Sequence, residues 1–132
     1  MTDSKHIAEQ DALRFINERI ESVPHLEALL LLWNSKPKHW SAEELAKRLY
    51  VDPKAAQTVF RDLSRQNLIS SSPDPPEEFF YESISEENDR VIAAVQAKYR
   101  TEIVAISNMI HRNVSSAVRD FADAFRFKKE RE

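Results

Sequence analysis

The stretch from residue 41 to residue 69, SAEELAKRLYVDPKAAQTVFRDLSRQNLI, constrains the fold more than any other part of the chain. Ser41 and Glu44 have the S-x-x-E spacing of a capping box, in which each side chain satisfies a free backbone N–H at a helix start. Asp52 followed by Pro53 is a second helix start, because Pro lacks the N–H that goes unpaired at the first position. Asn67 is the expected stop, since Asn tolerates the left-handed backbone conformation. The stretch therefore predicts two short helices joined by a tight turn.

Each of these helices carries an apolar stripe at helical spacing. The stripe residues are Leu45, Ala46 and Leu49 in the first helix and Ala56, Val59, Phe60 and Leu63 in the second. Helices this short bury little surface alone, so they need further elements to pack against. The chain supplies a strongly apolar helix upstream, at residues 25–34, and two short apolar segments downstream, at residues 68–70 and 79–82. We expect the two downstream segments to pair as a β-hairpin.

This arrangement resembles the winged helix-turn-helix domain of bacterial transcriptional regulators. The resemblance rests on the two stripes and on the exit Asn67-Leu68-Ile69, and it covers residues 23–83, about half of the chain. It implies a mainly α fold in which residues 23–84 form the winged helix-turn-helix domain with a short β-hairpin wing. Residues 1–22 then form an N-terminal helix, and residues 85–132 form a long C-terminal helical extension.

The resemblance also implies that the second helix of the pair, at residues 53–66, enters the major groove of DNA. Taking its apolar stripe as inward leaves an outward set of Lys54, Ala55, Gln57, Thr58, Arg61, Asp62 and Arg65. Arg61 can form two hydrogen bonds to guanine, and Gln57 can do so to adenine. Cations along the helix and in the preceding loop suit phosphates. The expected DNA-binding residues are therefore Lys36, Lys38, Lys54, Gln57, Thr58, Arg61 and Arg65. The alternative is a solvated face whose charges only keep the protein in solution.

Residues 85–111 predict a long amphipathic helix with apolar side chains every three or four positions. At a rise of about 1.5 Å per residue, such a helix is longer than a small winged domain needs. Its apolar stripe requires a cover, and a second copy of the chain is the simplest one. We therefore expect a homodimer, with dimerisation residues Ile92, Val95, Tyr99, Ile103, Ile106 and Ile110. Two further helices are expected, at residues 5–21 and from about residue 115 onward.

The loop between the two predicted strands is acidic, which argues against DNA binding. Asp74, Glu77 and Glu78 lie in it, and residues 70–85 hold no Lys or Arg. Carboxylates repel phosphates with little screening inside one Debye length, about 8 Å. A second hypothesis is therefore a protein-interaction or adaptor module that does not bind DNA, whose acidic wing meets a basic partner.

The chain of 132 residues contains no glycine and no cysteine. Phosphate-cradling loops, dinucleotide fingerprints and nucleophile elbows all need glycine, so an enzyme is not expected. Without cysteine there is no thiolate site, which fits a reducing cytoplasm. The histidines, His6, His25, His39 and His111, share no ligand spacing, so no metal or cofactor is expected. No apolar run approaches the roughly 18 residues of a membrane helix, and a cytoplasmic protein without membrane contact is expected.

Overall fold

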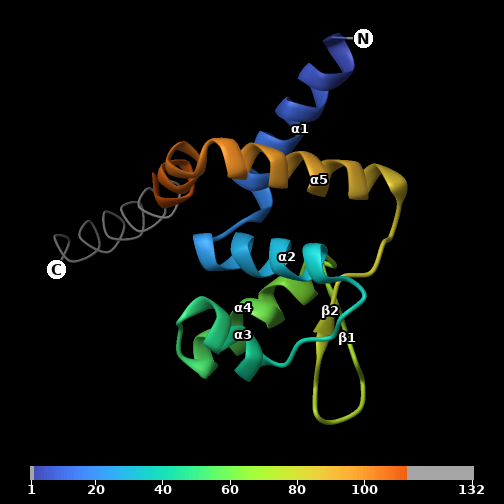
Figure 1. The fold of residues 1–132 in the computed structure, drawn as a ribbon, viewed down its shortest axis with the longest axis vertical. Helices are drawn as coiled ribbons and strands as arrows, with labels where there is room; N and C mark the ends of the chain where they lie inside the picture. The colour runs from blue at the N-terminus through green and yellow to red at the C-terminus, as the bar shows by residue number, and fades with distance from the viewer. Residues whose placement is uncertain (1, 113–132) are drawn as a thin grey trace, which may run out of the picture.

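A computed structural model describes the backbone of residues 2–112 and the side chains of residues 9–112. The elements, in order, are α1 (Thr2–Arg19), α2 (Val23–Ser35), α3 (Ala42–Leu49), α4 (Pro53–Arg65), β1 (Ser70–Ser71), β2 (Phe79–Phe80) and α5 (Glu86–Thr101) (Figure 1). Helical structure continues at residues 103–112. In Figure 1, α1 and α5 cross above α2, while α3 and α4 lie below it and the β-hairpin stands beside them. The predicted mainly α fold with a short β-hairpin wing is confirmed. Within residues 2–112, no helix combines the length and the apolarity that crossing a bilayer requires.

The capping signals form α3 and α4 as predicted. The Ser41 hydroxyl accepts the N–H of Glu44 at 3.1 Å, and the Glu44 carboxylate accepts the N–H of Ser41 at 3.0 Å. That backbone N–H is the main reason why the pKa of Glu44 lies below its usual value. Asp52 caps α4 and accepts the N–H of Lys54 at 3.4 Å. Asn67 adopts the left-handed conformation with φ of 60°, which confirms the predicted stop.

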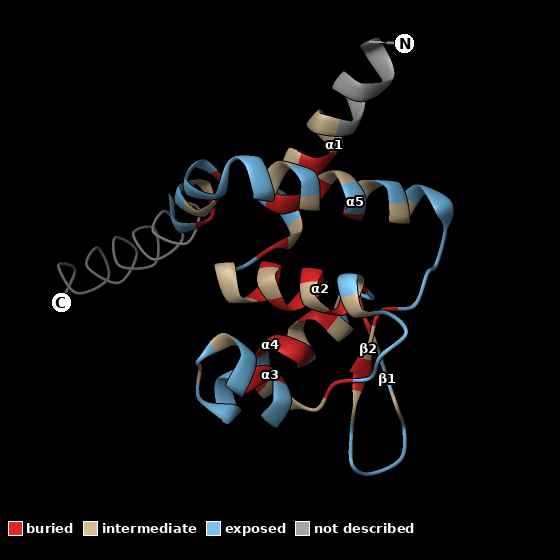
Figure 2. Ribbon diagram, in the orientation of Figure 1, coloured by how far each residue is buried: buried red, intermediate tan, exposed pale blue. Residues whose placement is uncertain are grey.

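One core joins α2, α3, α4 and the wing. Figure 2 shows buried residues concentrated on α2 and on the side of α4 that faces it. The ring of Phe60 on α4 stacks on the ring of Phe79 in β2, with centroids 4.6 Å apart. The fully buried side chains include Leu26, Leu29, Leu32, Leu45, Phe60, Leu63 and Phe79. The wing is therefore fastened to the helix pair through apolar contact as well as through its own hydrogen bonds.

The wing is shorter than the sequence suggested. Ser70 pairs with Phe80 and Ser71 with Phe79 in an antiparallel sheet of two strands. Leu68 and Ile69, expected in the first strand, are instead buried in the core as the chain leaves α4. Backbone hydrogen bonds of 2.7 Å in both directions also join Trp40 to Phe79, so the segment before α3 extends the pairing.

The amphipathic stripe of α5 is covered within the same chain, because α1 packs against α5 where the two helices cross. Ile92 and Val95 are completely buried, and Ile106 and Ile110 are nearly so. The half-buried Tyr99 donates its hydroxyl hydrogen bond to Glu27 of α2 at 3.1 Å. The predicted helix over residues 85–111 is also interrupted, since Glu102 leaves helical geometry with φ of −134° and ψ of 48°. Residues 113–132, including the helix expected from residue 115, lie outside the described residues.

Candidate nucleic-acid interface

The outward face of α4 carries exposed polar side chains opposite the buried apolar stripe. Lys54, Thr58, Arg61 and Arg65 are exposed, while Ala56, Val59, Phe60 and Leu63 are buried. Within the described residues, neither the Lys54 ammonium nor the Arg61 guanidinium forms an ion pair. An anionic partner could therefore meet either cation without breaking an ion pair to another described residue.

The wing brings a carboxylate onto the same face. Gln57 donates a hydrogen bond from its side-chain amide to Glu77 at 3.0 Å. An adenine-reading role for Gln57 would require this exposed bond to be exchanged for one to the base. A hydrogen bond of this kind contributes only about 0.5–1.5 kcal/mol, so the exchange is energetically accessible. Glu77 nevertheless adds negative charge beside the cations of α4.

The two loop lysines engage aromatic rings. The Lys36 ammonium lies 3.0 Å from the ring centroid of Trp33 and 5.6 Å from that of Tyr81. It also contributes to lowering the pKa of Asp89 on α5, which places it at the junction with that helix. The Lys38 ammonium lies 3.9 Å from the ring centroid of Trp40 and 3.8 Å from Glu44. The structure thus gathers Lys54, Thr58, Arg61 and Arg65 on α4, and it orients Lys36 toward α2, the end of the wing and α5.

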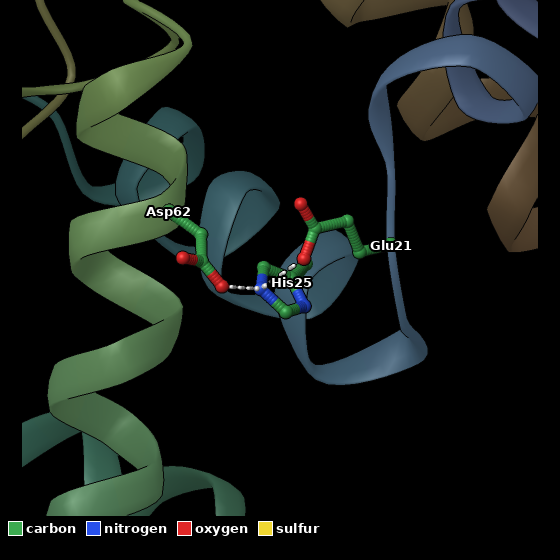
Figure 3. A group of neighbouring side chains, drawn as sticks. All are labelled: Glu21, His25 and Asp62. Atoms are coloured by element: carbon green, nitrogen blue, oxygen red, sulfur yellow. Dashed lines mark hydrogen bonds and ion pairs between the residues drawn. The ribbon is translucent and has the colours of Figure 1, made fainter. Parts of the chain in front are cut away.

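The inner flank of α4 is fastened to the rest of the fold by polar contacts that the sequence did not predict. Asp62, expected on the outward face, turns to His25 of α2, with 2.9 Å between Oδ2 and Nε2 (Figure 3). The side chains of Asp62 and His25 are only 18% and 11% exposed. At the end of α4, Arg19 donates to the carbonyl of Gln66 at 2.5 Å, and the Gln66 amide donates to the carbonyl of Arg19 at 2.9 Å. These partners are distant in sequence, so no local spacing could have revealed them.

A second polar cluster joins the end of the wing to α5. Asp89 accepts hydroxyl hydrogen bonds from Ser83 at 2.6 Å and from Tyr81 at 2.5 Å. These two bonds, that of Ser83 first, hold the pKa of Asp89 below its usual value. Burial, and then the bond to Asp89, raise the pKa of the Tyr81 hydroxyl. The cluster fixes the start of α5 relative to the wing.

Several solved structures of other proteins share this overall fold. The transcriptional regulator Tm0710 from Thermotoga maritima superposes with a TM-score of 0.52 at 14% identity, over 98% of this chain and 91% of that one. The chain has a winged helix-turn-helix fold. A MarR family protein from Bacillus stearothermophilus gives a TM-score of 0.51 at 15% identity, over 96% of this chain and 85% of that one. The S. aureus MepR–DNA complex gives a TM-score of 0.54 at 13% identity, over 88% of this chain and 93% of that one.

These identities are low, so the likeness establishes the winged helix-turn-helix fold and leaves the function to the residues of this chain. No family model and no curated protein sequence matches it. Tm0710 and MepR are both transcription regulators.

Proposed function

We propose that this chain is a DNA-binding transcriptional regulator that acts as a dimer and inserts α4 into the major groove. The observation that supports it is the exposed face of α4, where Lys54 and Arg61 form no ion pair within the described residues. The same fold is found in MepR, which has been solved in complex with DNA. In a winged helix-turn-helix domain, side chains on this face of the helix are those that reach base edges.

Each outward residue of α4 suits a definite contact. Arg61 would read guanine through its planar guanidinium, which matches the O6 and N7 acceptors of that base. Lys54, in the first turn of α4, and Arg65, at its end, would contact phosphates and fix the register of the helix on the duplex. Gln57 would read adenine after releasing Glu77.

The dimer would use apolar side chains beside the break at Glu102, which are exposed among the described residues. Ile103 is 52% exposed and Val104 is 72% exposed. Ile103 belongs to the dimerisation set predicted from sequence, whereas four other members of that set are buried within the chain. We therefore propose that Ile103 and Val104 meet a second copy. Sedimentation of the full chain would give a dimer, and Val104→Asp would shift it toward the monomer; a wild-type monomer at micromolar concentration would contradict the dimer.

The DNA-binding proposal is tested by fluorescence anisotropy on the DNA upstream of the gene, at several salt concentrations. Arg61→Ala should weaken binding to the best site by about 1–3 kcal/mol and relax the base preference at one position. The matched control is Arg90→Ala on α5, which removes an arginine that is 79% exposed and pairs with Glu86 at 3.7 Å. Equal effects of the two variants, or no salt-dependent binding by the wild type, would refute the proposal.

The acidic wing supports a second candidate, a protein-interaction or adaptor module. Glu77 lies against the outward face of α4, and residues 70–85 hold no cation to meet phosphates. Glu77→Gln separates the two functions, because it removes a charge that repels DNA. If α4 binds DNA, this variant should bind it more tightly than the wild type, while Glu87→Gln on α5 should not. A variant that leaves DNA affinity unchanged but loses a stoichiometric protein partner would favour the adaptor.

A further inference from the structure

A histidine and two carboxylates meet where three parts of the chain come together (Figure 3). Glu21 lies in the connection between α1 and α2, His25 in the first turn of α2, and Asp62 near the end of α4. The His25 Nε2 lies 2.9 Å from Asp62 Oδ2 and 3.7 Å from Glu21 Oε2. All three candidate ligand atoms lie within 4.8 Å of one another.

We propose that Glu21, His25 and Asp62 bind a first-row divalent transition-metal ion, with Zn²⁺ as the reference ion. Ligand atoms at about 2.0–2.2 Å from a tetrahedral Zn²⁺ lie about 3.3–3.6 Å apart, a range that falls between the two separations of His25 Nε2, 2.9 Å to Asp62 and 3.7 Å to Glu21. One imidazole nitrogen with two carboxylate oxygens suits Zn²⁺, Co²⁺ or Ni²⁺ better than Mg²⁺ or Ca²⁺, which prefer oxygen ligands only. The ion takes the place of the proton between Nε2 and Oδ2, and water completes the coordination.

The two more buried ligands, His25 and Asp62, each have a further contact that holds the side chain in position. The Ser22 hydroxyl is hydrogen-bonded to His25 Nδ1 and also accepts the backbone N–H of His25 at 3.3 Å, which fixes the ring and leaves Nε2 directed at the carboxylates. Arg65 lies 3.7 Å from Asp62 Oδ1, the oxygen that does not face His25. Such outer contacts are a regular feature of metal sites, because they hold the ligands in place.

Burial and charge favour an ion over a plain hydrogen-bonded pair. His25 and Asp62 are largely covered, whereas the Glu21 side chain is 61% exposed, so an ion can reach the site from solvent on the Glu21 side. Two carboxylates face one imidazole, and the Arg65 cation that pairs with the other oxygen of Asp62 is 76% exposed. A divalent ion would balance this excess of negative charge.

An ion at this site would connect α2 and the chain leaving α1 directly to α4. Asp62 follows Arg61, the proposed base-reading residue, so coordination would hold the helix that carries the outward face. Metal binding itself does not depend on the proposed DNA-binding function, and it is measured without DNA.

The test uses the full chain, free of any histidine tag and stripped with a chelator. Calorimetry with Zn²⁺ should show one ion bound per chain, and Co²⁺ should give visible absorption bands typical of nitrogen and oxygen ligands. Glu21→Gln, which alters an exposed side chain, should weaken Zn²⁺ binding by at least about tenfold, and His25→Gln should abolish it. Zn²⁺ should also raise the thermal unfolding midpoint of the wild type but not that of these variants.

The matched controls are Glu18→Gln on α1 and His39→Gln, since His39 lies 4.0 Å from Glu78 in an alternative histidine–carboxylate pair. Both controls should bind Zn²⁺ as the wild type does. If His25→Gln fails to fold, Glu21→Gln alone carries the test. The proposal is overturned if the wild type shows no saturable binding, if Glu21→Gln binds normally, or if His39→Gln is the variant that loses the ion.

Discussion

The α3–α4 pair and α5 each carry an apolar stripe that the sequence predicted, but the stripes are covered in different ways. The stripes of α3 and α4 face each other and α2, as predicted, because caps at Ser41 and Asp52 fix where each helix begins. The stripe of α5 was equally clear, yet its cover is α1 of the same chain instead of a second subunit.

The difference shows that an amphipathic pattern determines which side of a helix is buried, but it does not determine which element packs against that side. For α3 and α4 the partner follows from the short turn between them, which leaves little choice of neighbour. The residues of α1 and α5 that meet are far apart in sequence, so no turn specifies their contact. Ile103 and Val104, just beyond the end of α5, are exposed, and they are the residues of the proposed dimer contact.

Ile92→Ala tests whether the apolar stripe of α5 is buried within the chain, and it has the largest expected effect. Ile92 is completely buried, so its truncation should lower the free energy of unfolding by about 2–5 kcal/mol. Urea denaturation followed by circular dichroism measures this change. The control Ile84→Ala, at a side chain that is 64% exposed, should stay within about 0.5 kcal/mol. Similar values for the two variants would mean that α1 does not cover this stripe in solution.

Tyr81→Phe tests the polar junction between the winged domain and α5. Removing the hydroxyl that donates to Asp89 should lower the free energy of unfolding by about 1 kcal/mol at neutral pH. Because this bond helps to lower the pKa of Asp89, its stabilisation is complete above the usual Asp pKa of about 4 and is lost as the pH falls below that value.

The difference in the free energy of unfolding between wild type and Tyr81→Phe should therefore decrease as the pH is lowered. Urea titrations at neutral and acidic pH measure it, and Asp89→Asn should remove the pH dependence of the difference. If this difference in the free energy of unfolding instead increases at acidic pH, the junction is stabilised by something other than the Asp89 carboxylate.

Tyr50→Asn tests the turn of the α3–α4 pair and has the smallest expected effect. Tyr50 is 94% exposed and has a left-handed backbone with φ of 57°, a conformation unfavourable for most side chains. Asn tolerates this conformation, so the variant should gain up to about 1 kcal/mol in the free energy of unfolding. The reciprocal Asn67→Ala, at φ of 60°, should lose a similar amount. Thermal denaturation of both measures the effect, and a destabilised Tyr50→Asn would show that the tyrosine ring makes a contribution of its own.

Much of the candidate interface was predictable, because helical periodicity separates the outward from the inward positions of a helix whose start and end are known. Lys54, Thr58, Arg61 and Arg65 were placed correctly on the exposed side of α4. Asp62 was not, because it lies at the edge of the apolar stripe, where a polar side chain can turn either to solvent or to a neighbouring helix. The pairing of Gln57 with Glu77 was also missed, since it depends on how the wing folds back.

The sequence by itself determined the capped helix pair, its apolar stripes and the acidic wing, because each depends on residues within a few positions of one another. Tertiary structure decided that α1 covers α5, that Asp62 meets His25 and that Gln66 meets Arg19. These contacts join residues that are distant along the chain, and they form only where packing of the whole core brings them together. Among the candidate metal ligands, only Asp62 belongs to this second class: Glu21 and His25 lie four positions apart, but the docking of α4 on α2 is what brings Asp62 within reach of the same ion.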